Sequence, residues 1–175
     1  MSTLFVAVIL IGSVVAICLL LIGIHNKNKR EAMNNILKHF SQLGTENNLS
    51  FSSQEILDHC VLGLDGVQRK ILVATRRDEH YGSFIIDLNE VKNCSVKKIY
   101  GTIKAGELKN HKLEKYLEKI VLHFELHRKP AVEIVFYENF GNHISQTQEL
   151  EQKAKHWEAI LSKLQTPALQ RVRTE

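Results

Sequence analysis

The sequence predicts an α+β protein with three parts: an N-terminal transmembrane helix, an antiparallel sheet of six to seven strands, and a C-terminal amphipathic helix. Three observations predict this class. An uncharged apolar run fills residues 4–24, short apolar runs separated by turn residues follow from about residue 55, and an apolar stripe at helical spacing ends near residue 165. The expected divisions are an anchor at 1–25, a juxtamembrane helix and linker at 26–53, a folded domain at 54–166, and a flexible tail at 167–175.

The N-terminal run is expected to stay uncut in the membrane. It holds 21 residues from Leu4 to Ile24, and a helix of that length covers the roughly 30 Å hydrocarbon core. A cleaved signal has a charged start and a shorter apolar region, whereas only Met1-Ser2-Thr3 precedes this run. Lipid attachment at Cys18 is disfavoured, because Ile17 rather than a small residue precedes it. The residues expected to span the membrane are Leu4, Ile9, Val14, Cys18, Leu21 and Ile24.

Basic residues directly after this run set its expected orientation. Lys27, Lys29 and Arg30 follow the apolar segment, and no basic residue precedes it. The positive-inside rule then places the rest of the chain in the cytoplasm, at the inner face of the cell membrane. The same residues are expected to attract anionic lipid of the bilayer.

The charge distribution argues against a nucleic-acid partner. Residues 51–165 hold 17 Lys and Arg against 16 Asp and Glu, so the folded part is nearly neutral although the whole chain carries +4. A nucleic-acid-binding domain concentrates basic charge on its own surface. Cys18, Cys60 and Cys94 suggest neither a disulfide framework nor a metal site, and no cofactor is expected.

A juxtamembrane helix is predicted over residues 26–43. Met33, Ile36, Leu37 and Phe40 recur at helical spacing. Gly44 is expected to cap this helix. The polar stretch that follows predicts a linker over residues 44–53.

The change of period after this linker predicts strands. Two runs, 56–64 and 69–76, flank Asp65-Gly66, a dipeptide suited to the positive-φ positions of a tight hairpin. Further strands are expected within 81–91, 94–103 and 131–138. The apolar pattern of residues 113–127 fits either a helix or a strand. We favour a short helical or loop start followed by a strand from about Tyr116 to His127.

The last element is predicted to be an amphipathic helix. Ser145-Gln146-Thr147-Gln148 matches a capping box, and Thr166-Pro167 ends the helix. Such a helix must lay its apolar stripe on the sheet. The residues of that stripe are Leu150, Ala154, Trp157, Leu161 and Leu164.

This order of elements resembles a pleckstrin-homology-like domain. The resemblance is carried over residues 55–165 by "LGLDGVQRKILVA", "FIIDLNEV", "IVLHFEL", "AVEIVFY" and the helix around "AKHWEAIL". It implies a bent sheet closed at one end by a helix bearing a tryptophan. An anchor before such a domain is similar to that of many small bacterial membrane proteins. The family has seven strands and the sequence shows six, so either "NFGNHI" hides an edge strand or the fold differs.

Two constellations were weighed for chemistry. His123 and His127 have i, i+4 spacing that suits zinc, but no third ligand is near and the base of the metalloprotease motif is missing. Asp58-His59-Cys60 places a potential nucleophile, Cys60, next to a potential base, His59. Neighbouring residues of a strand point to opposite faces, so these two side chains would not touch, and Asp58 on the same face as Cys60 would raise the thiol pKa. A metal-dependent enzyme using His59, His80, His123 or His127 is therefore the weakest hypothesis.

The leading hypothesis is a non-enzymatic, membrane-anchored domain that binds an unidentified protein through an exposed strand edge or the groove beside Trp157. The alternative is a domain that binds anionic lipid headgroups. The resemblance implies a basic cluster in the loop between the first two strands for lipid binding, but this loop, 65–68, is short and begins with an acid. The possible lipid contacts are Lys27, Lys29, Arg30, Arg69, Lys70, Arg76 and Arg77.

Overall fold

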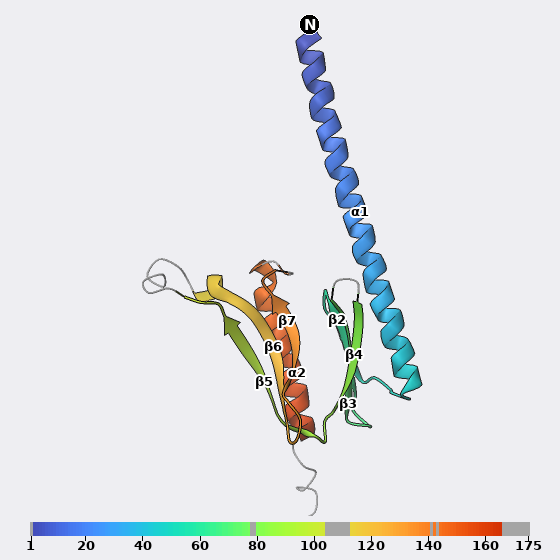
Figure 1. Cartoon of the computed structure of the whole chain (residues 1–175), viewed down its shortest axis with the longest axis vertical. Helices are drawn as coiled ribbons and strands as arrows, with labels where there is room; N and C mark the ends of the chain where they lie inside the picture. The colour runs from blue at the N-terminus through green and yellow to red at the C-terminus, as the bar shows by residue number, and fades with distance from the viewer. Residues whose placement is uncertain (1, 78–79, 104–112, 141, 143, 166–175) are drawn as a thin grey trace, which may run out of the picture.

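The computed structural model describes residues 2–77, 80–103, 113–140, 142 and 144–165. This part of the chain holds two α-helices and seven strands. In chain order they are α1 (Ser2–Glu46), β1 (Ser53–Ile56), β2 (Cys60–Asp65), β3 (Lys70–Arg77), β4 (His80–Asp87), β5 (Val91–Tyr100), β6 (Leu117–Leu126), β7 (Val132–Glu138) and α2 (Thr147–Gln165). Figure 1 shows the N-terminal part of α1 projecting away from the sheets.

The strands form two antiparallel sheets rather than one. The first has the order β1-β2-β3-β4 and the second the order β5-β6-β7. The strand that the sequence did not reveal is β1, which lies at the end of the expected linker, whereas Asn139 and Phe140 of "NFGNHI" form a turn. The favoured interpretation of residues 113–127 is confirmed, since a short 3₁₀ helix, Leu113–Tyr116, leads into β6.

The main core lies between the two sheets and α2. Leu150, Ala154, Trp157 and Leu161 of α2 are buried there, and Leu164 packs against them partly exposed. Ion pairs join α2 to both sheets, from Lys153 Nζ to Glu55 Oε1 on β1 (3.2 Å) and from Glu151 Oε2 to Lys98 Nζ on β5 (2.7 Å). The helix therefore closes the space between the sheets.

A second core lies on the outer face of the first sheet, under α1. Val61 of β2 and Leu72 and Ala74 of β3 form a cluster with Ile36 and Phe40 of α1. Their neighbours along the same strands belong to the main core. Because successive strand residues point to opposite faces, β2 and β3 are covered on both sides. The second half of α1 is thus part of the folded unit and not a separate juxtamembrane segment.

Gly63 allows α1 to approach the sheet this closely. A Cβ atom at this position would lie 2.5 Å from Phe40 Cζ and 2.7 Å from Phe51 Cδ1. The rings of Phe40 and Phe51 stack with their centroids 4.7 Å apart. The helix ends at Glu46 rather than at the expected Gly44. After its end, Asn48 adopts a φ of 51° and the Leu49 amide donates to the Gly44 carbonyl. This geometry is that of a Schellman cap.

The predicted transmembrane segment is contradicted. Among the residues whose side chains are described, no helix carries an apolar stretch long enough to cross a bilayer. This overturns the expected anchor at Cys18, Leu21 and Ile24, and with it the single-pass topology and the inner-membrane location. The side chains of Leu4, Ile9 and Val14, and the predicted tail at 167–175, lie outside the described residues.

The turn between β2 and β3 depends on a buried carboxylate. Asp65 is 1% exposed and accepts hydrogen bonds from the backbone amides of Ser50 (2.7 Å), Val67 (2.9 Å) and Gln68 (2.8 Å). The bonds from Gln68 and Ser50 are the main reason that the pKa of Asp65 lies below its ordinary value of 3.8. The positive φ in this turn belongs to Arg69, at 56°, and not to the expected Asp65-Gly66.

The Asp65 carboxylate is expected to make folding sensitive to acid. A lowered folded-state pKa contributes stability above the ordinary value, and this contribution is lost as the pH falls through 3.8 and then through the lower folded value. Asp65→Asn keeps an acceptor oxygen but no charge. Urea unfolding should show the variant less stable than the wild type at neutral pH, with the difference shrinking in acid. A difference that stays constant with pH would contradict this role.

Candidate functional site

A cleft of about 340 Å³ opens where the two sheets diverge. It draws residues from β2, β3 and β4 of the first sheet, from β7 of the second, and from the turn before β2. Its lining residues are His59, Cys60, Val73, Thr75, Arg76, Phe84, Glu133, Ile134, Val135 and Glu138. The volume lies within the range of small binding pockets.

Strand register explains why residues distant in sequence meet on the floor of the cleft. Cys60 pairs with Thr75, and Val73 pairs with Phe84. Directly paired residues point to the same face of a sheet, so these four side chains share the inner face of the first sheet. Three of the four are apolar, which makes the floor of the cleft apolar.

The turn between β1 and β2 holds the two sheets and α1 together beside the cleft. His59 Nε2 lies 3.0 Å from the Val135 carbonyl oxygen of β7. Because a carbonyl only accepts, Nε2 carries the proton and donates. Asp58 accepts from Lys29 Nζ of α1 (3.0 Å) and from Asn142 Nδ2 (3.2 Å).

Acidic groups at the rim already have partners. Glu133 Oε1 lies 3.0 Å from His123 Nδ1, and Glu138 Oε1 lies 2.7 Å from Lys119 Nζ. Both partners lie on β6, the neighbouring strand. The carboxylates are therefore held along β7 and are less available to bind a single cation.

The thiol in the cleft is buried and protonated. Burial raises the pKa of Cys60 to about 12, so the thiol stays protonated at neutral pH, and the thiolate is the reactive form. The cause is burial and not Asp58, which lies in a turn and points toward α1. His59, its neighbour in sequence, donates to the Val135 carbonyl.

The two histidines considered as zinc ligands are separated by the end of β6. His123 lies within β6 and contacts Glu133, whereas His127 follows the strand. Across the described residues, no group of three or more His, Cys, Asp or Glu side chains is placed to hold a metal ion. His80, the remaining histidine of the enzyme hypothesis, is exposed at the start of β4.

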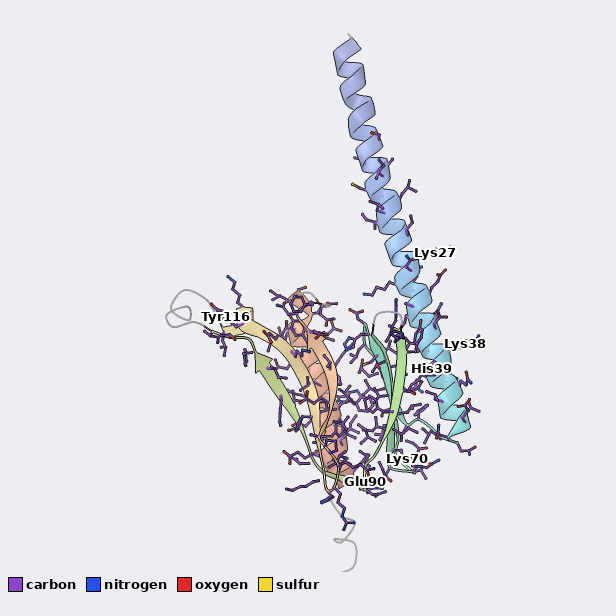
Figure 2. The ribbon with its side chains drawn as sticks, viewed as in Figure 1. Lys27, Lys38, His39, Lys70, Glu90 and Tyr116 are labelled. Carbon is purple, nitrogen blue, oxygen red and sulfur yellow. The ribbon has the colours of Figure 1, made fainter. Side chains whose placement is uncertain are left out.

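The seven basic residues considered for lipid contact do not form one site. Arg69 and Lys70 lie at one end of β3, and Arg76 and Arg77 at the other. At about 3.3 Å per strand residue these two groups are about 20 Å apart. Lys27, Lys29 and Arg30 of α1 lie at the Arg76 end, where Lys29 is paired with Asp58. Figure 2 shows Lys27 and Lys70 at opposite ends of the folded part.

Sequence reasoning missed most of the cleft. Thr75, Phe84, Glu133 and Glu138 come from three strands and carry no motif. One signal was present: Gly82 interrupts a strand pattern, and an isolated strand glycine often marks a close approach of another group.

Comparison of the chain with known proteins finds no matching family model, no matching curated protein and no matching solved structure.

Proposed function

We propose that the chain is a non-enzymatic interaction protein and that its folded unit binds a segment of a partner protein at the cleft between the sheets. The observation that carries this proposal is the make-up of the cleft. Its floor is apolar, its acids are already paired, and its thiol is protonated. Such a surface is suited to recognising side chains by shape and burial rather than to transforming a substrate.

A protein segment suits the cleft better than a small cation. Glu133 and Glu138 lie beside their partners His123 and Lys119, so neither carboxylate offers an isolated negative charge to a cation. Strands bound the cleft on both sides. A segment of chain can combine contacts to such strands with an apolar side chain placed on the floor.

The resemblance to pleckstrin-homology-like domains remains part of this proposal. The resemblance implies seven strands and a closing helix with a tryptophan. The order of elements supports it, because a four-stranded antiparallel sheet is followed by a three-stranded one and then by α2, which buries Trp157. Arg69 and Lys70 lie at the opposite end of β3 from Arg76 and Arg77, so these four residues cannot contact one lipid headgroup together.

Filling the cleft should weaken binding. Thr75 lies half-buried on the floor, and Thr75→Tyr places an aromatic ring there. Peptides would be selected from a random display library on the full chain, and their affinity measured by isothermal titration calorimetry. We expect binding to the variant to be at least about tenfold weaker, which is about 1.4 kcal/mol.

The matched control is Val67→Tyr, which adds a ring in the turn between β2 and β3, where Val67 is 92% exposed. The control should bind within about twofold of the wild type, and both variants should keep the wild-type circular dichroism spectrum. Equal affinities for the two variants, or a failure to select any peptide, would contradict the proposal.

A further inference from the structure

Edge strands decide where another strand can join a sheet. The strand orders leave four edges, on β1, β4, β5 and β7. Along each edge, every second residue directs its backbone N–H and C=O away from the sheet. These groups need partners when they are covered by another molecule, and they supply a template for an added strand.

The edges of β5 and β7 are occupied by side chains of this chain. On β5, the Val96 amide donates to Glu158 Oε1 of α2 (3.0 Å), and Lys98 pairs with Glu151. On β7, the Val135 carbonyl accepts from His59, and the Glu138 amide donates to Asn142 Oδ1 (3.0 Å). Side chains of α2, the helix that carries Trp157, thus cross the groove between this helix and β5.

The edge of β1 is short. The Leu57 amide donates to the Cys60 carbonyl at the turn, so the alternation directs the backbone groups of Glu55 and Ser53 toward β2. Only Gln54 and Ile56 of this four-residue strand face outward. Two outward residues give little length for strand pairing.

The edge of β4 is longer and open. The Leu88 amide donates to the Arg69 carbonyl. Because every second residue of an antiparallel strand bonds to the same neighbour, the backbone groups of Ile86, Phe84 and Gly82 also point toward β3. Tyr81, Ser83 and Ile85 therefore direct their backbone groups outward. Within the described residues, no hydrogen bond is recorded for these outward groups. Tyr81 and Ile85 also leave 42% and 40% of their surface exposed.

Gly82 connects this edge to the cleft. It pairs with Thr75 on the floor, and Phe84 lies two residues further on the same inner face. Without a side chain at Gly82, the inner face of β4 is open at this position. A residue of an added strand placed opposite Gly82 can pass its side chain over the glycine toward Thr75.

We infer that the partner segment binds as an extended strand added along β4, with one side chain crossing Gly82 into the cleft; this inference rests on the proposed function. The segment exchanges backbone hydrogen bonds with Tyr81, Ser83 and Ile85. The residues of the segment that lie beside Tyr81 and Ile85 are apolar or aromatic, because their side chains cover the exposed side chains of these two residues. β4 is an edge strand of the first sheet and has β3 as its only neighbour there among the described strands.

Ser83→Pro tests the strand pairing. Proline removes the outward N–H of residue 83 and leaves the bonds from β4 to β3 intact, since proline is tolerated at outward positions of edge strands. The control Ser83→Ala keeps the N–H. For peptides selected on the full chain, Ser83→Pro should weaken binding at least about tenfold while Ser83→Ala stays within about twofold.

Gly82→Val tests the route into the cleft. A Cβ at this position would lie 3.2 Å from Thr75 Oγ1, and no positive φ opposes the substitution. Thermal melts check that the variant folds, and its binding should also fall by about tenfold. Together the two variants examine the backbone and side-chain parts of the inference.

The outcomes separate this inference from the proposed function. If Thr75→Tyr weakens binding but Ser83→Pro and Gly82→Val do not, the partner uses the cleft without β4 and the inference is overturned. If no peptide is selected, or if Thr75→Tyr binds normally, the proposed function fails first. Self-association that Ser83→Pro abolishes, measured by analytical ultracentrifugation, would identify a second copy as the occupant and overturn the partner segment.

Discussion

Replacing Trp157 with alanine is expected to destabilise the folded unit by about 3–5 kcal/mol. Trp157 is 1% exposed and packs in the core that both sheets share with α2. Its removal leaves a cavity at the point where Ala154 and Leu161 also contact the sheets. Because natural domains are stable by only about 5–15 kcal/mol, urea unfolding should show a large shift of the midpoint.

The adjacent exposed residue supplies the control. His156→Ala changes a side chain on the solvent face of α2 and should alter stability by no more than about 0.5 kcal/mol. Similar midpoints for Trp157→Ala and His156→Ala would mean that α2 does not hold the two sheets together.

Replacing Phe40 with alanine is expected to cost a similar amount, about 3–5 kcal/mol. Phe40 is 3% exposed, stacks on Phe51 and contacts the outer face of the first sheet. Urea unfolding followed by circular dichroism would measure the loss. This cost is expected although Phe40 lies outside the domain that the sequence predicted, at 54–166.

Asn35→Ala is the matched control for this second core, because Asn35 is an exposed residue of α1. A chain that begins at residue 51 should also unfold at lower urea concentration, because it lacks the cover of Val61, Leu72 and Ala74. Should Phe40→Ala be no more costly than Asn35→Ala, the second half of α1 would not belong to the folded unit.

The sequence was most informative where the signal is local. The stripe that includes Trp157 recurs at helical spacing, and the observed helix, Thr147–Gln165, buries that stripe. The strands β3, β6 and β7 were located within one residue, because β-branched and aromatic residues between turns report on a half-buried pleated surface. The predicted bounds of β2, β4 and β5 were wrong by three or four residues at one end or both. Both patterns are set by neighbours only a few positions away.

Domain boundaries were less predictable because they depend on packing partners. The strand β1, with the sequence SQEI, has no apolar alternation, and it exists because β2 supplies its hydrogen bonds. The run ILVA in β3 is continuously apolar, which is typical of a strand buried on both faces. That pattern becomes meaningful only once Ile36 and Phe40 of α1 are seen to cover one of those faces.

By itself, the sequence determined the α+β class, the C-terminal helix and the positions of most strands, because helical and strand periodicities are local properties of the chain. Tertiary structure alone decided that the strands divide into two sheets and that α1 joins the core. It also decided the cleft, where Cys60, Thr75, Phe84 and Glu133 meet. The physical reason is that strand register and sheet divergence arise from pairings between distant residues, which no local pattern encodes.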